Sequence, residues 1–180
     1  IKTLLNGPIQ QAPQQQIISD GLGSYSYVEF INRLSRFGQL LRRFGVGRGD
    51  VVAIMDWDTH RYLESFFAVP MLGATLHTVN IRLSPSQIAY TIDHADDDVI
   101  LVHVDFLPLL EEVMPQVKRD VRLIIMRDAP DRELPHTTLQ IEAILDELFL
   151  EADSDFSFPN FDENTRATTF YTTGTTGYPK

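Results

Sequence analysis

The sequence predicts an α/β protein in which a mostly parallel sheet is covered by helices. Two observations lead to this fold class. Short apolar segments without polar interruption, of which Val51–Met55 is typical, predict strands that are buried on both faces. Segments with helical spacing of apolar residues separate these strands, and the two patterns alternate at least four times. Such alternation indicates right-handed crossovers between parallel strands, with ligands bound beyond the carboxyl ends of the strands.

The N-terminal part of the chain precedes this alternation. Residues 1–16 are rich in Gln and Pro, and we expect them to form an irregular surface arm. Residues 17–25 predict a hairpin with a glycine-dependent turn. Residues 28–44 carry apolar side chains at helical spacing, and the glycines within residues 45–49 are expected to end that helix.

The elements of the alternating region follow in order. Ser84 is the expected N-cap of a helix with Pro85 at its first position, and Pro70 is expected to kink or end the preceding helix. Predicted strands cover residues 51–55, 74–79, 99–102, 121–126 and 167–171. Predicted helices cover residues 60–72, 85–95, 106–117 and 139–149. We expect these elements to belong to one domain portion that spans residues 17–180.

Composition excludes several classes of function. The 180 residues include 15 Lys plus Arg and 25 Asp plus Glu, which gives a net charge of −10. Nucleic acid and anionic membranes repel such a chain, and the basic residues of segment 33–48 alternate with apolar ones, as on a helix with one wet face. The absence of cysteine excludes disulfides, zinc–thiolate sites and cysteine nucleophiles. No apolar run is long enough to span a membrane, so a cytoplasmic location is expected.

A loop rich in Thr and Gly follows the last predicted strand, and it has the sequence YTTGTTGYPK from Tyr171 to Lys180. Threonine hydroxyls can donate to phosphate oxygens, glycines let backbone N–H groups form an anion cradle, and Lys180 supplies a positive charge. A hydroxyl of Thr172 or Thr173 also suits magnesium, which prefers hard oxygen ligands. The candidate ATP phosphate-binding residues are Thr172, Thr173, Gly174, Thr175, Thr176, Gly177 and Lys180.

The spacing of this loop excludes the Walker motif. That motif needs four residues between its glycines and a Lys directly after the second glycine. Here two threonines separate the glycines, and Tyr178 and Pro179 stand between Gly177 and Lys180. A flexible surface linker is the alternative, but linkers seldom follow a buried strand and end in Pro-Lys. A phosphate-binding loop is therefore the favoured interpretation.

The loop resembles the signature of the adenylate-forming superfamily, which includes acyl-CoA synthetases, luciferases and peptide-synthetase adenylation domains. The resemblance extends upstream through GVGRGDVVAIM at residues 45–55 and through residues 60–102, which are most similar to medium- and long-chain fatty-acyl-CoA synthetases. It covers residues 17–180 and implies the first portion of the large N-terminal domain of such an enzyme. Because the chain begins at Ile1 and stops within the signature loop, we expect it to be a fragment.

The resemblance implies a two-step ligase of fatty acid metabolism. A medium- or long-chain fatty acid attacks the α-phosphate of Mg-ATP to give an acyl-adenylate and pyrophosphate, and coenzyme A then displaces AMP to form a thioester. In this family the loop holds the β- and γ-phosphates, a role that carries over to Thr172 through Gly177 and to Lys180. The family's catalytic lysine and its segments for adenine, ribose, magnesium and the acyl group would lie beyond Lys180. We therefore expect no catalytic residue within this chain and no activity of the chain alone.

Two other functions remain open at this point. The chain could belong to an adenylation domain that loads a carrier protein, or to a non-catalytic nucleotide-binding module. The resemblance also suggests a homodimer in which residues 1–16 join the interface, and a disordered tail is the alternative.

The remaining polar residues are assigned structural roles. Trp57, Asp58 and His60 follow the first strand, and a helix start with Asp58 or Thr59 as N-cap is favoured over a substrate-pocket role. We expect His77 and His103, in or beside predicted strands, to be core or edge histidines with satisfied hydrogen bonds and not ligands. Around His94 and its flanking aspartates, a helix end with a solvated acidic turn is favoured over a metal site.

Overall fold

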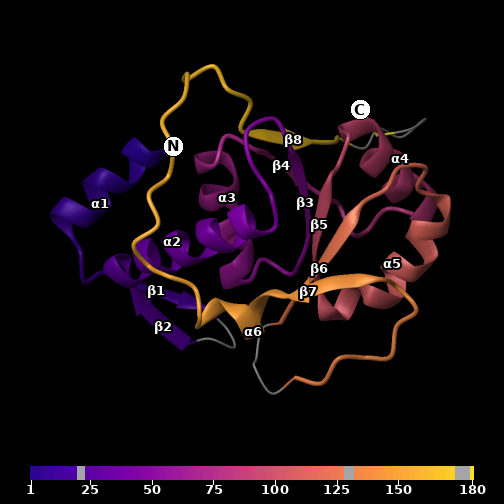
Figure 1. The fold of residues 1–180 in the computed structure, drawn as a ribbon, viewed down its shortest axis with the longest axis horizontal. Coiled ribbons are helices and arrows are strands. Elements are labelled where there is room, and N and C mark those ends of the chain that lie inside the picture. The colour runs from indigo at the N-terminus through magenta and orange to yellow at the C-terminus, as the bar shows by residue number, and fades with distance from the viewer. Residues whose placement is uncertain (20–22, 128–131, 173–178) are drawn as a thin grey trace.

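A six-stranded sheet forms the centre of the structure (Figure 1). The computed structural model describes residues 1–19, 23–127, 132–172 and 179–180. All neighbouring strands in this sheet run parallel, in the order β7-β6-β5-β3-β4-β8, which confirms the predicted fold class. The strands are β3 (Val51–Met55), β4 (Thr75–Thr78), β5 (Val99–His103), β6 (Arg122–Met126), β7 (Ile141–Ile144) and β8 (Thr168–Phe170).

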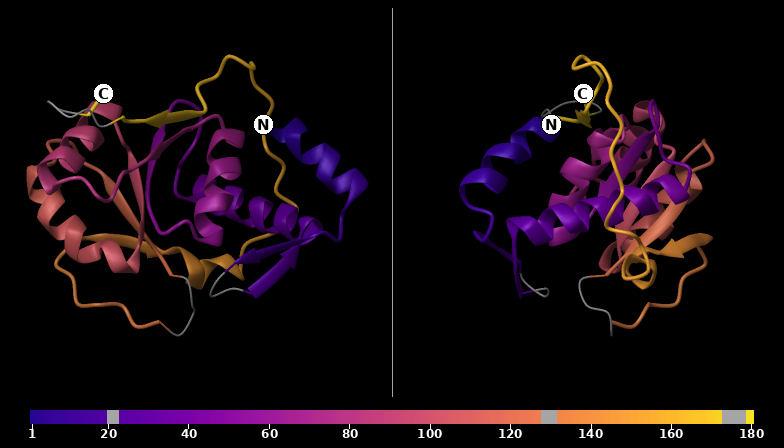
Figure 2. Two further views of the ribbon diagram at one scale, coloured as in Figure 1. Left: turned by 180° about the vertical axis from the view of Figure 1, so that it is seen from behind. Right: turned by 60° about the vertical axis from the view of Figure 1, so that its left-hand side comes forward.

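Helices cover both faces of the sheet, as the two views in Figure 2 show. The main helices are α2 (Tyr27–Arg43), α3 (His60–Met71), α4 (Pro85–Ala95) and α5 (Leu107–Val113). Val52 and Ile54 of β3 belong to the apolar cluster under α2 and α3, whereas Ala53 and Met55 belong to the cluster under α4 and α5. Both faces of the strand are therefore buried, which explains its uninterrupted apolar sequence.

Hydroxyl side chains cap the N-termini of three of these helices. Ser26 caps α2 and Ser84 caps α4, each in a capping box with the residue three positions later. Thr59 caps α3 by accepting a hydrogen bond from the N–H of Arg61 at 3.1 Å. The predicted caps at Ser84 and Thr59 are confirmed, and Pro70 lies in the last turn of its helix as expected.

The predicted hairpin near the N-terminus is confirmed. Strand β1 (Gln16–Ser19) pairs antiparallel with β2 (Gly23–Ser26), and β2 leads directly into α2. The predicted turn at residues 20–22 lies outside the described residues. Gly45, which follows α2, has φ of +77°, so it supplies the left-handed conformation expected where that helix ends.

The N-terminal arm is helical, which corrects the prediction of an irregular arm over residues 1–16. A 3-10 turn, η1 (Lys2–Leu5), leads into α1 (Asn6–Gln11). Pro8 is tolerated because N–H groups in the first turn of a helix have no helical acceptor in any case. The apolar Leu5 packs against the core beside α2, so tertiary burial outweighs the turn-forming composition. A dimer interface at this arm stays a prediction.

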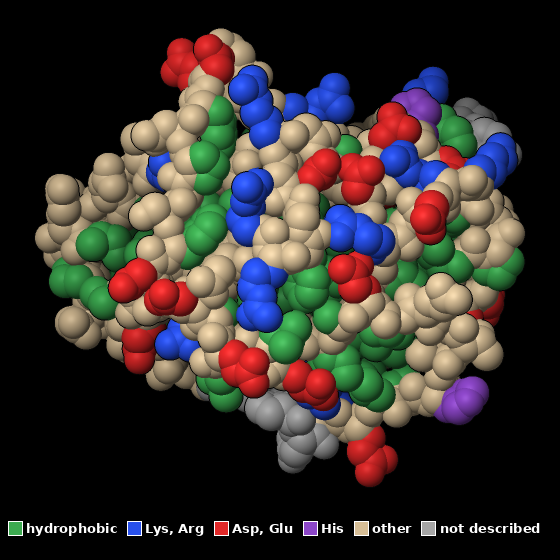
Figure 3. All heavy atoms as spheres, in the orientation of Figure 1, with side chains coloured by type: hydrophobic (Ala, Val, Ile, Leu, Met, Phe, Trp, Pro, Cys, Tyr) green, Lys and Arg blue, Asp and Glu red, His purple; other side chains and the backbone are tan. Residues whose placement is uncertain are grey.

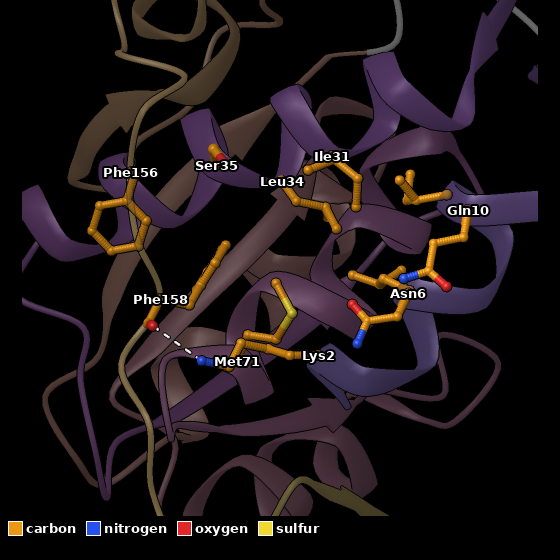
Figure 4. Close-up of a pocket in the computed structure, with 11 residues that line it drawn as sticks. Lys2, Asn6, Gln10, Ile31, Leu34, Ser35, Met71, Phe156 and Phe158 are labelled. Atoms are coloured by element: carbon orange, nitrogen blue, oxygen red, sulfur yellow. Dashed lines mark hydrogen bonds between the residues drawn. The ribbon is translucent and has the colours of Figure 1, made fainter. Parts of the chain in front are cut away.

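A cavity of about 380 Å³ lies between α1, α2 and the segment around Phe158 (Figure 4). Lys2 closes one side of it, donating from Nζ to the carbonyl oxygens of Phe158 at 3.2 Å and Pro159 at 3.0 Å. The apolar side chains that line it are Leu5, Ile9, Ile31, Leu34, Met71, Phe156 and Phe158. Figure 1 shows α1 on the opposite side of the molecule from the C-terminus.

Two predicted helices differ from the structure. Residues 139–149 were expected to be one helix but form the edge strand β7 followed by a short helix, α6 (Leu145–Phe149). The backbone of β6 pairs with β7, with a register shift between Leu123 and Ile124, and helical spacing cannot reveal this tertiary contact. The predicted helix over 106–117 is broken into η2 (Val104–Phe106), α5 and η3 (Met114–Gln116).

Gly38 lies where the chain crosses α2 on its way to β8. A Cβ atom at Gly38 would stand 2.5 Å from ring atoms of Phe158. We expect Gly38→Ala to lower the free energy of unfolding by about 1–2 kcal/mol, because displacement of the ring costs more than the gain in helix propensity. Gly7→Ala in α1 is the matched control, since nothing lies within 4 Å of its added Cβ. Urea titration of both variants tests this, and equal stabilisation would contradict it.

Acidic and basic side chains are interspersed on the face shown in Figure 3, without a continuous basic patch. Arg42 and Arg43 at the end of α2 are exposed, as expected for a helix with one wet face, whereas Arg33 turns inward to the buried Glu64. Of the helices in the described ranges, none has the length and apolar character needed to cross a membrane.

Candidate functional site: the base of the Thr/Gly loop

The predicted phosphate loop starts where the edge strand β8 ends. Strand β8 pairs with β4, with Phe170 opposite Thr78, so Tyr171 and Thr172 emerge at the carboxyl end of the sheet. The backbone N–H of Thr172 donates to the carbonyl of Lys180 at 2.8 Å, and the N–H of Lys180 donates to the carbonyl of Thr172 at 3.0 Å. The two ends of the predicted loop are therefore joined to each other.

The structure thus brings together two of the seven predicted phosphate-binding residues. Thr172 and Lys180 are both exposed, and the Thr172 hydroxyl also donates to the Lys180 carbonyl at 3.2 Å. The other predicted phosphate-binding residues, Thr173, Gly174, Thr175, Thr176 and Gly177, lie outside the described residues. A hydroxyl and an ammonium group at one exposed loop base fit a ligand that is rich in negative charge.

Tyr171, the residue before Thr172, is held by two histidines. Its hydroxyl forms a hydrogen bond of 2.8 Å with Nδ1 of His94 on α4. Its ring lies edge-on to the ring of His77 on β4, with centroids 5.2 Å apart. Burial, with the nearby charge of Asp97, raises the pKa of Tyr171 to about 12, so the phenol stays protonated at neutral pH.

His77 is itself fixed by a buried carboxylate. Its Nδ1 lies 2.7 Å and 3.0 Å from the two carboxylate oxygens of Asp97, and both side chains are almost fully buried. Burial raises the pKa of Asp97, although the bond to His77 opposes this shift. Among the described residues, His77 Nε2 has no hydrogen-bond partner. His77 is therefore a buried core histidine, as predicted, but only one of its two ring nitrogens is hydrogen-bonded among the described residues.

The acidic turn around His94 closes a helix, as predicted, but it is solvated only in part, because Asp97 is fully buried against His77. Asp96 adopts the left-handed conformation at the C-cap of α4, with φ of +63°, and pairs with Arg119 at 2.8 Å. Asp98 accepts a hydrogen bond from the N–H of Val51 at 2.9 Å. In the part of the chain that the structure describes, no group of three or more His, Asp or Glu side chains could hold a metal ion.

A second group of polar and aromatic residues follows β3 at the same edge of the sheet. Trp57 is 53% exposed, and its ring packs on Phe106 with centroids 4.6 Å apart. Its Nε1 donates to Asp105 at 2.8 Å. The carboxylate of Asp56 accepts a hydrogen bond from the hydroxyl of Thr59 at 2.5 Å, which supports the predicted helix start.

Sequence reasoning missed a buried ionic network that joins α2, α3 and α6. Glu64, with no exposed side-chain area, pairs with Arg33 at 2.5 Å and with Arg61 at 2.6 Å. Arg61 also pairs with Asp146 at 2.5 Å and stacks on the ring of Phe149, 3.8 Å from its centroid. The pattern in the sequence that could have indicated part of it is the i, i+3 pair Arg61 and Glu64 on one helix face. The network joins α2, α3 and α6.

The chain was also compared with known protein families, curated proteins and solved structures. Residues 8–180 match the family model described as AMP-binding enzyme. The chain is 41% identical to a long-chain-fatty-acid–CoA ligase of Thermus thermophilus over 86% of its length and 27% of that protein. It is 33% identical to a 3-methylmercaptopropionyl-CoA ligase of Ruegeria lacuscaerulensis over its whole length and 34% of that protein. The chain therefore spans about a third or less of the relatives it matches.

Solved structures share the fold at lower identity. An anthranilate CoA ligase superposes with a TM-score of 0.83 at 20% identity, covering 98% of this chain and 32% of that one. A fatty acyl CoA synthetase of Mycobacterium tuberculosis gives a TM-score of 0.79 at 17% identity, again covering 98% and 32%. These similarities support the fold that the sheet order and helix placement define.

Proposed function

This chain belongs to the family of AMP-binding enzymes, and from that premise we propose that its protein is an ATP-dependent acid–thiol ligase. In the first step, a carboxylate oxygen forms a bond to the α-phosphorus of ATP, and the bond from that phosphorus to the bridging oxygen breaks to release pyrophosphate. In the second step, the sulfur of coenzyme A bonds to the acyl carbon and AMP leaves. The product is an acyl-CoA thioester.

In this proposal, the loop that starts at Thr172 holds the β- and γ-phosphates of ATP. The single observation that supports this proposal is the closure of Thr172 on Lys180 through two backbone hydrogen bonds, which joins the first and last of the proposed residues at an exposed position beyond β8. The ammonium group of Lys180 would offset the negative charge that moves onto pyrophosphate. Thr173, Gly174, Thr175, Thr176 and Gly177 are proposed to complete the cradle. Thr172 is the proposed hydroxyl ligand for magnesium, which would offset negative charge on the phosphates.

The proposed acid is a medium- or long-chain fatty acid. The relatives' names support a carboxylic acid in general, because they specify a long-chain fatty acid, a medium-chain fatty acid and 3-methylmercaptopropionate. Pyrophosphate release by the full-length protein, measured with acids of two to eighteen carbons, tests the proposal. We expect the highest kcat/KM at eight carbons or more. A preference for acetate or 3-methylmercaptopropionate would contradict the chain-length assignment.

The acceptor in the second step is tested separately. We expect the full-length protein to form a thioester with coenzyme A, whereas thioester formation on a carrier protein alone would favour the other kind of adenylation domain. Absence of pyrophosphate release with every acid would favour a non-catalytic nucleotide-binding module.

We further propose that residues 1–180 alone release no pyrophosphate, because they span about a third of the related ligases. The proposed location is the cytoplasm.

A further inference from the structure

We propose that His77 and His94 are positioning residues for the ATP-phosphate loop, because together they fix Tyr171 directly before Thr172. This inference rests on the proposed function of the loop. It adds two residues from β4 and α4 to a site that the loop sequence alone places after β8. Both act through Tyr171 and are not proposed to contact ATP.

The first contact joins the end of β8 to the last turns of α4. Tyr171 Oη and His94 Nδ1 are 2.8 Å apart, and the two rings stand edge-on at 77° with centroids 5.7 Å apart. Because the phenol is protonated at neutral pH, it donates to His94 when that imidazole nitrogen is unprotonated. This hydrogen bond fixes the direction of the Tyr171 side chain relative to a helix that is itself packed on the sheet.

The second contact fixes the Tyr171 ring from within the sheet. The ring of His77 stands at 64° to it. Rotation of His77 would break its bonds of 2.7 Å and 3.0 Å to Asp97 in a site that water does not reach. A buried carboxylate that loses its partner is costly, so the Asp97 pair keeps the His77 ring in one orientation. The Tyr171 ring therefore packs against a His77 ring that is held in one orientation.

The local fold explains why such anchors matter at this position. Strand β8 has three residues, and its one described neighbour in the sheet is β4. Backbone pairing of this length leaves the end of an edge strand weakly held. With Tyr171 fixed on two sides, the next residue, Thr172, starts from a defined position and forms its two backbone bonds with Lys180. Pre-ordering of this loop base reduces the entropy lost when ATP binds.

The test compares steady-state constants for pyrophosphate release by the full-length protein and its variants. Tyr171→Phe keeps the ring and removes the hydroxyl, and we expect the KM for ATP to rise about fivefold, the effect of one lost hydrogen bond. The kcat and the KM for the acid should change less than twofold. His94→Leu should have the same effect, and the double variant should be no worse than either single variant.

Matched controls lie elsewhere on the chain. Tyr27→Phe at the start of α2 and His136→Leu on an exposed segment make the same chemical changes, and the KM for ATP should not move. His77→Gln tests the second anchor, since glutamine can still donate to Asp97 but offers no ring to Tyr171. We expect a rise in the KM for ATP there as well.

The outcomes separate this inference from the proposed function. An unmodified protein that releases no pyrophosphate with any acid would overturn both. An active protein whose Tyr171→Phe and His94→Leu variants keep the original KM for ATP would overturn the positioning role alone. Lowered melting temperatures with unchanged KM, or single effects that multiply in the double variant, would also overturn it.

Discussion

Replacement of Glu64 by alanine should lower the free energy of unfolding by about 3–5 kcal/mol, the typical loss when one partner of a buried ion pair is removed. Glu64 has no exposed side-chain area and faces the guanidinium groups of Arg33 and Arg61 at 2.5 Å and 2.6 Å. Asp146 would remain as the counter-ion of Arg61, but Arg33 would lose its carboxylate partner. Urea-induced unfolding of the purified protein measures the effect.

A double-mutant cycle measures the coupling between Arg33 and Glu64 directly. The variant that carries both Arg33→Ala and Glu64→Ala leaves the Arg61–Asp146 pair balanced in charge. Its loss of stability should therefore be smaller than the sum of the two single losses by at least about 1 kcal/mol. Glu112→Ala, on an exposed position of α5, is the control and should change stability by less than about 0.5 kcal/mol. A Glu64→Ala effect as small as that of the control would show that the network contributes little.

Replacement of Lys180 by glutamine should lower kcat/KM for ATP in pyrophosphate release by about 10- to 100-fold, the usual effect of one charge-assisted hydrogen bond. The expectation follows from the exposed ammonium group at the closed base of the proposed phosphate loop. The KM for the fatty acid should stay nearly unchanged, because the lysine is proposed to contact phosphate and not the acyl chain. Initial rates over a range of ATP concentrations provide the measurement.

Lys118→Gln is the matched control for the Lys180 substitution. Lys118 is also exposed, but it follows η3 and not the strand that leads into the loop. It should therefore leave kcat/KM for ATP unchanged. If Lys180→Gln and Lys118→Gln both reduce the rate to the same small extent, the effect is one of general charge and the assignment of Lys180 to the phosphates fails.

Prediction from the sequence succeeded where the structure depends on residues that are adjacent in the chain. The apolar segment Val51–Met55 is buried on both faces, so its sequence shows a central parallel strand without any knowledge of its neighbours. The helix starts at Thr59 and Ser84 were predictable for a different reason, since the capping hydrogen bonds are made within the same turn.

Prediction failed where a distant contact decided the local structure. Residues 141–144 form a strand because their backbone pairs with β6. The N-terminal arm is ordered because Leu5 packs against the apolar core beside α2. In both segments the local preference is weak, so the tertiary contact determines the conformation.

By itself, the sequence determined the class of the fold and the composition and spacing of the Thr/Gly loop that ends in Lys180. These properties are local, because they depend on residues that are close together along the chain. Only the tertiary structure decided what surrounds the loop base. His77, His94 and Asp97 lie far from Tyr171 in the chain, and the pairing of β4 with β8 and the packing of α4 bring them together. The same holds for the network of Arg33, Glu64, Arg61 and Asp146, because a buried charge requires a partner and only the folded chain shows which one it has.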